Sequence, residues 1–299
     1  MLAADKPFLR FVREERVFCA ALAHLLMEAG PNLSTFLDIV NSRLSPDRRL
    51  STRGMEDAEI YLEFSYLRDD WYELRRKNDE KRTRILSLFA RIPSLAALSS
   101  AGFPQEIAEF NGRFMGKRGL MITKDIVYPG QWTTGALEGL AQDFGLGGEG
   151  FRDLCRFKWA FNIKPDLVAL LPGSRPLCVE AKLESRLASY PVGAQECARF
   201  DRVVGPRRRV GQIELQQFMF EKLLDTPCQP VVIGARAFEQ DVAIGDDHGV
   251  TPFVGWAEIF ARLDLRSSIP FVRRLLSENE ILPRQQPRSA AGRTRLQSG

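Results

Sequence analysis

The sequence predicts an α/β fold with a largely helical central segment. Apolar residues recur at helical spacing near the N-terminus, and short apolar runs separated by turn residues follow residue 151, as in neighbouring strands. The chain has 299 residues, of which 44% are hydrophobic and 27% are charged. This composition is typical of a globular protein and excludes a wholly disordered or collagen-like chain.

Two helices are expected within the first fifty residues. The first covers residues 8–29 and ends at Gly30 and Pro31. The second runs from Ser34 to Leu44, just before Pro46. The apolar face of the first helix follows the helical period and consists of Phe18, Cys19, Leu22, Leu25 and Leu26.

The central segment is the most highly charged part of the chain. Residues 55–91 are predicted to form one long helix whose middle carries charges of alternating sign. We interpret that middle as a solvated face with ion pairs between residues four positions apart (i and i+4), and a face that binds phosphate is the alternative. Residues 92–150 are expected to form short helices broken by glycines, with a strand at Leu120–Tyr128.

Short apolar runs after residue 151 predict a sheet. Residues 155–162, 164–171 and 176–183 are expected to be adjacent strands, and the turn from Pro172 to Pro176 makes the last two a hairpin. The elements expected beyond this hairpin are a helix over Val210–Leu224, a strand over 229–238 and a helix over 255–263.

The sequence shows neither a membrane span nor a disulfide framework. No run of about 18 uncharged apolar residues is present, and residues 1–16 carry charges where a signal peptide would have an apolar core. Five cysteines, with no C-x-x-C spacing, suit reduced thiols. We therefore expect a cytoplasmic protein.

The excess of positive charge lies in the last residues of the chain. Residues 284–299 contain four arginines and no acid, and we expect this basic tail to be disordered. Removing those four from the 42 Lys and Arg leaves 38, which equals the number of Asp and Glu. The net charge of +4 is therefore weak evidence for a nucleic-acid partner.

The predicted hairpin carries the residues with the clearest chemistry. Asp166 follows Pro165 at the start of one strand, and Glu180 and Lys182 lie on the next. Side chains alternate along a strand, so Cys178, Glu180 and Lys182 share one face while their neighbours face an apolar core. Two carboxylates and a backbone carbonyl are ligands suited to Mg²⁺, and a nearby lysine can activate water or stabilise charge on a phosphoryl oxygen.

Pro165-Asp166 and Glu180-Ala181-Lys182 resemble the signature of the PD-(D/E)XK nuclease superfamily. The resemblance implies a restriction-endonuclease-like core, a mixed central sheet flanked by helices, that uses Mg²⁺, for which Mn²⁺ can substitute. Asp166, Glu180 and the Ala181 carbonyl would bind the metal, and Lys182 would orient the attacking water. The implied organisation is N-terminal core helices in 1–50, a mainly helical insertion in 51–150, the remaining core in 151–283 and the tail in 284–299.

Two further features agree with this resemblance. Family members often carry a glutamate on the N-terminal core helix that reaches the metal site. Glu15 lies on the apolar face of the first predicted helix and would contribute to the metal directly or through water; Glu14 is the competing candidate. Many members also carry a glutamine on the helix after the E-x-K strand, where Gln212 begins such a helix. Gln216 occupies the position of the tyrosine in a Q-x-x-x-Y variant of the motif, so it departs from that pattern.

Other polar clusters are weaker candidate sites. Arg207, Arg208 and Arg209 lie between the E-x-K strand and the glutamine helix, where they could hold a phosphate backbone or form a solvated loop. His24 is expected to be a surface or packing residue. His248, in the sequence Gly-Asp-Asp-His-Gly, is expected in a turn, with opportunistic metal binding as the alternative.

The expected function is a metal-dependent endonuclease, rather than an exonuclease, acting on DNA more readily than on RNA. The resemblance also suggests bacterial defence against phage or mobile elements, a homodimer, and a possible activating partner protein. The main alternative is a catalytically inactive restriction-endonuclease-like protein that binds nucleic acid or a partner protein. A helical interaction protein acting through residues 55–91 is the second alternative.

Overall fold

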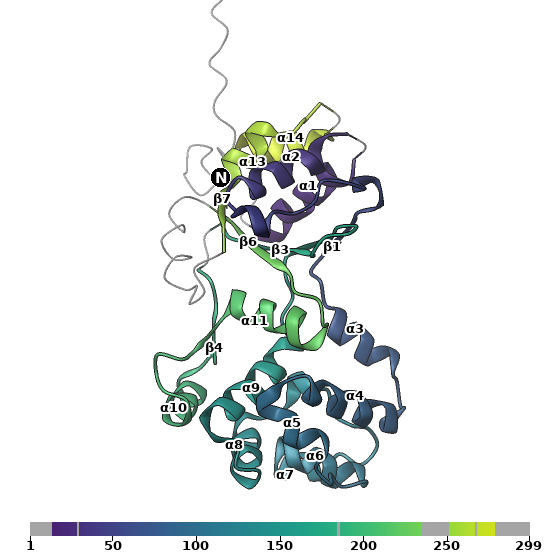
Figure 1. Cartoon of the computed structure of the whole chain (residues 1–299), viewed down its shortest axis with the longest axis vertical. Helices are drawn as coiled ribbons and strands as arrows, with labels where there is room; N and C mark the ends of the chain where they lie inside the picture. The colour runs from purple at the N-terminus through teal and green to yellow at the C-terminus, as the bar shows by residue number, and fades with distance from the viewer. Residues whose placement is uncertain (1–13, 29, 184–185, 235–250, 267, 279–299) are drawn as a thin grey trace, which may run out of the picture.

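A five-stranded mixed sheet forms the centre of one lobe, and a helical lobe extends from it (Figure 1). The computed structural model describes residues 14–28, 30–183, 186–234, 251–266 and 268–278. The strands, in spatial order, are β1 (Glu59–Leu62), β2 (Leu167–Leu170), β3 (Leu177–Ala181), β6 (Gln229–Gly234) and β7 (Phe253–Gly255). β1, β2 and β3 pair antiparallel, whereas β6 and β7 run parallel to β3.

The predicted hairpin is present as β2 and β3. Leu167 pairs with Val179 and Ala169 with Leu177, and Gly173 in the connecting turn has a φ of +62°. Leu177, Val179 and Ala181 face one apolar core, while Cys178 faces the other. The alternation expected from the sequence is therefore confirmed, and it directs Glu180 away from the core that Leu177, Val179 and Ala181 face.

Within the described part of the chain, four helices cover the face of the sheet that bears Leu177, Val179 and Ala181. They are α1 (Glu15–Met27), α2 (Asn32–Asn41), α13 (Trp256–Arg262) and α14 (Pro270–Glu278). The helix predicted over 34–44 and the helix predicted over 255–263 are thus found with shifted ends. Residues 8–13 of the first predicted helix lie outside the described residues.

The other face of the sheet is covered by α11 (Gln212–Phe218), whose last turn continues as a π-helical segment, Met219–Leu223. Beyond α11 lies the helical lobe, with an aromatic core (Figure 1). Its helices are α3 (Tyr66–Glu73), α4 (Asn78–Ala90), α5 (Ala96–Ser99), α6 (Ile107–Met115), α7 (Lys117–Leu120), α8 (Thr134–Asp143) and α9 (Gly147–Ala160). A short ribbon of β4 (Ser189–Tyr190) and β5 (Val210–Gly211) flanks α10 (Ala194–Val203).

The prediction of one long helix over 55–91 is wrong. β1 begins at Glu59, and two separate helices, α3 and α4, follow it. The chain turns at Glu63 and at Arg75, whose φ angles of +47° and +46° cannot continue an α-helix. Residues 51–150 are mainly helical but also supply this edge strand of the central sheet.

The strand expected over 155–162 is also wrong, because these residues belong to α9. Cys155, Phe157 and Trp159 alternate as in a strand, yet all three are buried in a helix surrounded by other helices. Phe151 and Leu154 extend the buried set at helical spacing. Because this helix is buried on nearly all sides, its apolar residues fit both the two-residue period of a strand and the 3.6-residue period of a helix.

No strand forms at residues 120–128, contrary to expectation. This segment lacks a ladder partner, and Asn111 on α6 satisfies its backbone instead. The Asn111 amide donates to the carbonyls of Ile122 and Asp125, each at 2.9 Å, and its oxygen accepts from Val127 N–H at 3.0 Å.

Replacing Asn111 by alanine is expected to lower the free energy of unfolding by about 3 kcal/mol, since three largely buried hydrogen bonds are lost together. Urea denaturation measures the change. Asn162→Ala is the control, because that exposed amide makes a single hydrogen bond, to the Gly130 carbonyl. Equal effects of the two substitutions would contradict the role given to Asn111.

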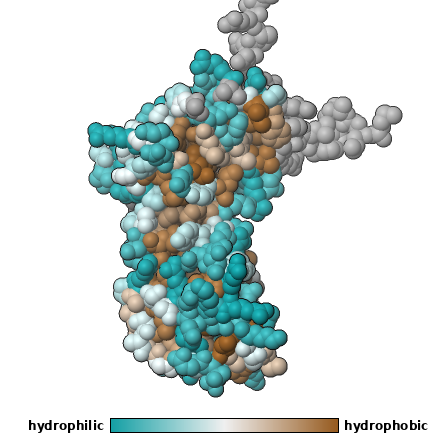
Figure 2. Space-filling view, turned by 90° about the vertical axis from the view of Figure 1, so that its right-hand side faces the viewer, coloured by the Kyte–Doolittle hydropathy of each residue, from teal (hydrophilic) through white to brown (hydrophobic). Residues whose placement is uncertain are grey.

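The distribution of polar side chains agrees with this arrangement. Figure 2 shows them over much of the face on which β1 and α3 lie, with apolar surface on the sheet lobe and at the junction of the lobes. No helix within the described part of the chain is long and apolar enough to cross a membrane. Residues 235–238 of the strand predicted after the glutamine helix, and the tail 284–299, lie outside the described residues.

Candidate active site

A buried ion pair lies at the carboxyl end of β3. The Lys182 ammonium is 2.7 Å from Oε1 of Glu180, and the two residues are only 6% and 1% exposed. Ladder bonding to β6 places them, because Lys182 N–H donates to the Ile233 carbonyl at 2.7 Å. Trp256 on α13 holds the next peptide group by donating its indole N–H to the Lys182 carbonyl at 3.1 Å.

Two glutamine amides from α11 hold the Glu180 carboxylate. Gln212 donates to Oε1 at 2.5 Å and Gln216 donates to Oε2 at 2.6 Å. The spacing of four residues puts both side chains on one face of the helix. Each amide is itself fixed, since the Gln216 oxygen accepts from the Cys178 thiol and the Gln212 oxygen accepts from Ala188 N–H.

Two more carboxylates complete the cluster, from a strand and from a helix. Asp166, at the start of β2, accepts a hydrogen bond from Ala181 N–H at 2.8 Å. Glu15, the first residue of α1, accepts from Leu183 N–H at 2.9 Å, and its other oxygen lies 3.9 Å from the Lys182 ammonium. Three carboxylates and one ammonium therefore meet at one end of the sheet, although Glu15, Asp166 and the Glu180–Lys182 pair come from three separate parts of the sequence.

The electrostatics of the cluster are unfavourable for negative charge. Burial, and after it the charge of Asp166, raise the pKa of Glu180 to about 7, against the lowering effects of Lys182 and Gln216. Burial also raises the pKa of Asp166, although the Ala181 N–H and Lys182 oppose the shift. Both carboxylates are thus held in a site that favours an added cation.

The same charges act on two neighbouring groups. Burial lowers the pKa of Lys182, but Glu180 and Glu15 outweigh burial and raise it above its usual value, so the ammonium stays protonated. Burial, followed by the charges of Asp166, Glu180 and Glu15, raises the pKa of the Cys19 thiol. Cys19 is therefore a neutral packing residue on α1 and has no thiolate chemistry.

The donor set fits a divalent cation by its chemistry. When ionised, three carboxylates against one ammonium leave two negative charges, and carboxylate oxygen is the ligand that Mg²⁺ and Mn²⁺ prefer. A carboxylate has about four acceptor positions; Glu180 uses three for Lys182, Gln212 and Gln216, and the Asp166 side chain also contacts it, so a metal would have to displace one of these partners. Within the described residues, no three Asp, Glu, His or Cys side chains form a preassembled metal-ligand group. Asp166, Glu180 and Glu15 would therefore have to draw together around the ion.

The structure separates the remaining sequence candidates from this cluster. Glu14 precedes α1 and pairs with the exposed Arg16, so Glu15 is the glutamate that reaches the site. His24 lies in the last turn of α1 against Glu28, at the end of the helix away from Glu15. His248 and its neighbours Asp246 and Asp247 lie outside the described residues.

The three arginines of the loop before β5 are engaged in part with local acids. Arg208 pairs with Glu149, and Arg209 pairs with Asp201 at 2.6 Å. Arg207 is exposed. A role for Arg207, Arg208 and Arg209 in phosphate binding stays a prediction, and any phosphate would compete with these two carboxylates.

Two residues near the cluster, Tyr190 and Trp256, are not among the sequence candidates. Burial raises the pKa of Tyr190, and the charge of Glu180 raises it further, which places the phenol within electrostatic range of the cluster. Trp256 supports the Lys182 peptide from α13. No sequence pattern links either residue to the cluster. Tyr190 lies on β4, which is only two residues long, and Trp256 follows the E-x-K run by more than seventy positions.

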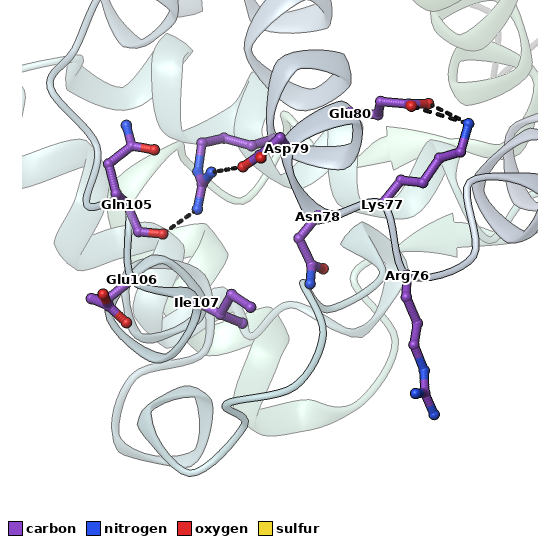
Figure 3. Close-up of a pocket in the computed structure, with 9 residues that line it drawn as sticks. Arg76, Lys77, Asn78, Asp79, Glu80, Gln105, Glu106 and Ile107 are labelled. Carbon is purple, nitrogen blue, oxygen red and sulfur yellow. Dashed lines mark hydrogen bonds and ion pairs between the residues drawn. The ribbon is translucent and has the colours of Figure 1, made fainter.

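A polar cavity of about 520 Å³ lies elsewhere, at the start of α4 in the helical lobe (Figure 3). Arg82 donates to Asp79 and to the Gln105 carbonyl, and Lys77 pairs with Glu80. Both ion pairs, Arg82 with Asp79 and Lys77 with Glu80, join residues three positions apart rather than the four expected from the sequence. The lining carries equal numbers of cations and anions, which supports the solvated-face interpretation over the phosphate-binding alternative.

Replacing Gln216 by alanine is expected to destabilise the fold by about 2 kcal/mol, because a fully buried amide that holds Glu180 and Cys178 is lost. Thermal or urea unfolding measures this. Gln217→Ala on the same helix is the matched control and is expected to change stability by less than about 0.5 kcal/mol. A larger effect at Gln217 than at Gln216 would refute the holding role.

Its geometry makes the site a cluster of three carboxylates and one lysine at one end of the sheet. No family model, no curated protein and no solved structure matches this chain.

Proposed function

We propose that this protein is a divalent-metal-dependent nuclease with a restriction-endonuclease-like core, acting most readily on DNA. One observation carries the proposal: α1, β2 and β3 bring Glu15, Asp166 and the Glu180–Lys182 pair together at one end of a mixed sheet. A structural ion pair needs one carboxylate for one lysine. Three carboxylates around one buried lysine are in excess of that need, and a cation-binding site accounts for them.

The residues of the cluster divide into three roles in the proposed reaction. Asp166, Glu180 and Glu15 would hold the metal, together with the Ala181 carbonyl, and the metal would supply Lewis-acid activation of the phosphodiester. Lys182 would orient water and stabilise charge on a phosphoryl oxygen. Gln212 and Gln216 would keep Glu180 in one orientation, so that the carboxylate does not have to reorganise during the reaction.

A cleavage panel tests the proposal. Wild-type protein is incubated with plasmid DNA, linear single-stranded DNA and RNA in Mg²⁺, Mn²⁺ or EDTA. We expect cleavage that requires metal and is lost in Glu180→Gln. Glu221→Gln is the matched control, because Glu221 pairs with Lys222 at the surface. Cleavage that persists in EDTA or in Glu180→Gln would refute the proposal.

The catalytically inactive alternative also rests on an observation. Glu180 and Lys182 are almost fully buried, and Glu180 already accepts three hydrogen bonds, as in a structural pair. Calorimetric titration with Mn²⁺ separates the two functions. No binding and no cleavage on any substrate would favour the inactive alternative, whereas binding of one Mn²⁺ would favour the nuclease.

A further inference from the structure

Three aromatic side chains, Tyr61, Phe64 and Tyr66, form a partly exposed strip where β1 leads into α3. The rings of Tyr61 and Phe64 lie 5.8 Å apart, edge to face, and those of Phe64 and Tyr66 are stacked at 6.0 Å. Tyr61 is 42% exposed and Tyr66 is 48% exposed. Phe64 anchors this aromatic strip by stacking on Phe220 of the core at 5.6 Å.

The aromatic strip is attached directly to the strand that carries Asp166. Glu63 N–H donates to the Asp166 carbonyl and Phe64 N–H donates to the Pro165 carbonyl, each at 3.0 Å. β1 is an edge strand that leads toward α3 (Figure 1), and its last residue, Leu62, pairs with Leu167 beside Asp166, so the strip begins at the sheet end where the carboxylates meet. The same side of the molecule shows apolar surface at the junction of the lobes (Figure 2).

Two cations pair with Glu63, which belongs to the same segment as the aromatic strip. Arg16 is 2.6 Å from Glu63, and Lys164 is 3.8 Å from the same carboxylate. Lys164 lies two residues before Asp166 in the chain, and Arg16 also comes within 3.8 Å of the exposed Glu14. Ion pairs that are open to solvent contribute little free energy, so a phosphate can compete for both cations.

Exposed aromatic rings beside cations suit one kind of polymer in particular. Bases of single-stranded nucleic acid expose their faces and stack on aromatic side chains, while the phosphates contact Lys and Arg. Bases inside a duplex are stacked on one another and do not offer these faces. A protein partner would fit the rings, but the two adjacent cations and the direct attachment to Asp166 favour a polynucleotide that leads to the cluster.

We propose that the aromatic strip binds the bases of single-stranded nucleic acid, with the backbone passing Arg16 and Lys164 toward Asp166. This inference rests on the proposed function and names its substrate class. It predicts that the protein prefers single strands, or single-stranded segments next to a duplex, over continuous duplex.

The test measures binding directly, without cleavage. Anisotropy of fluorescein-labelled oligo-dT and of a duplex of equal length is recorded in EDTA with wild type and with Tyr61→Ala/Tyr66→Ala. We expect the affinity for oligo-dT to fall by about 10- to 100-fold, since each stacked base contributes substantially to binding, while the duplex affinity changes less than about twofold. Tyr61→Phe/Tyr66→Phe keeps both rings and is expected to bind as wild type does.

The matched control is Tyr72→Ala. Tyr72 is an exposed tyrosine of α3 that stacks on Tyr128 in the helical lobe and lies outside the aromatic strip. Its replacement is expected to leave oligo-dT binding within about twofold of wild type. Melting temperatures of all variants are compared first. If Tyr61→Ala/Tyr66→Ala is unfolded, Tyr61→Phe/Tyr66→Phe is the folded variant that keeps both rings of the strip.

Each contrary outcome has a separate meaning. The inference is overturned if wild type does not bind oligo-dT, if duplex binding falls as much as oligo-dT binding, or if Tyr72→Ala has the same effect. A wild-type dimer that dissociates in the alanine pair would assign the strip to a contact between copies and also overturn it. Selective binding to oligo-dT without cleavage in Mg²⁺ or Mn²⁺ would support the strip and overturn only the nuclease.

Discussion

Replacing Lys182 by alanine is expected to lower metal-dependent cleavage by at least about 100-fold, the scale seen when one preorganised charge is removed from an active site. The reason is geometric: the Lys182 ammonium lies 2.7 Å from Glu180, with Glu15 also within 3.9 Å. Initial cleavage rates on one substrate, in Mn²⁺ and at saturating protein, measure the loss.

Loss of the lysine also leaves the buried Glu180 carboxylate without its partner. Breaking a buried pair in this way lowers the free energy of unfolding by about 3–5 kcal/mol. Glu180→Gln/Lys182→Met removes both charges together and is expected to fold well while being equally inactive. Lys222→Ala removes a surface lysine from its pair with Glu221 and serves as the control. A folded Lys182→Ala protein that cleaves at the wild-type rate would exclude Lys182 from the reaction.

Without metal, the protein is expected to be more stable at pH 5 than at pH 8. Burial and Asp166 raise the pKa of Glu180 from 4.5 to about 7, so between these values the folded protein binds a proton that the unfolded chain does not. The free energy of unfolding therefore falls as the pH rises through this window and levels off above it. The contribution of Glu180 alone is about 3 kcal/mol.

Urea denaturation in EDTA at the two pH values measures this difference. Glu180→Gln carries no titrating group at this position and is expected to lose most of the pH dependence, whereas Glu221→Gln at the surface keeps it. Saturating Mn²⁺ should raise stability most at pH 8, because the cation replaces the missing proton. A Glu180→Gln protein with the wild-type pH dependence would contradict the assignment of the shift to Glu180.

The part of the site that lies on one hairpin can be predicted from the sequence. Glu180 and Lys182 alternate with apolar residues. That period of two predicts that both side chains lie on the sheet face opposite the one that bears Val179 and Ala181. Glu15 can also be placed, because a charged residue on the apolar stripe of a helix needs a partner, and it finds one at Leu183 and Lys182.

The remaining contacts of the site depend on tertiary packing. Gln212 and Gln216 stand four residues apart, which indicates a shared helix face but does not reveal that both amides meet Glu180. β1 has no sequence signal, because three of its four residues are exposed and the strand lacks a buried alternating face. α9 resembles a strand in its sequence because burial on nearly all sides makes its alternating apolar residues uninformative.

The central claim is that Asp166, Glu180 and Glu15 form a divalent-cation site that is used for cleavage. Titration of Mn²⁺ into wild type and Asp166→Asn by calorimetry, with cleavage measured on the same preparations, tests it most directly. The account predicts one bound Mn²⁺ in wild type, affinity at least about tenfold weaker in the nearly isosteric variant, and a parallel loss of cleavage. A cleavage rate that is the same in wild type and Asp166→Asn, or an Mn²⁺ affinity that the substitution leaves unchanged, would contradict it.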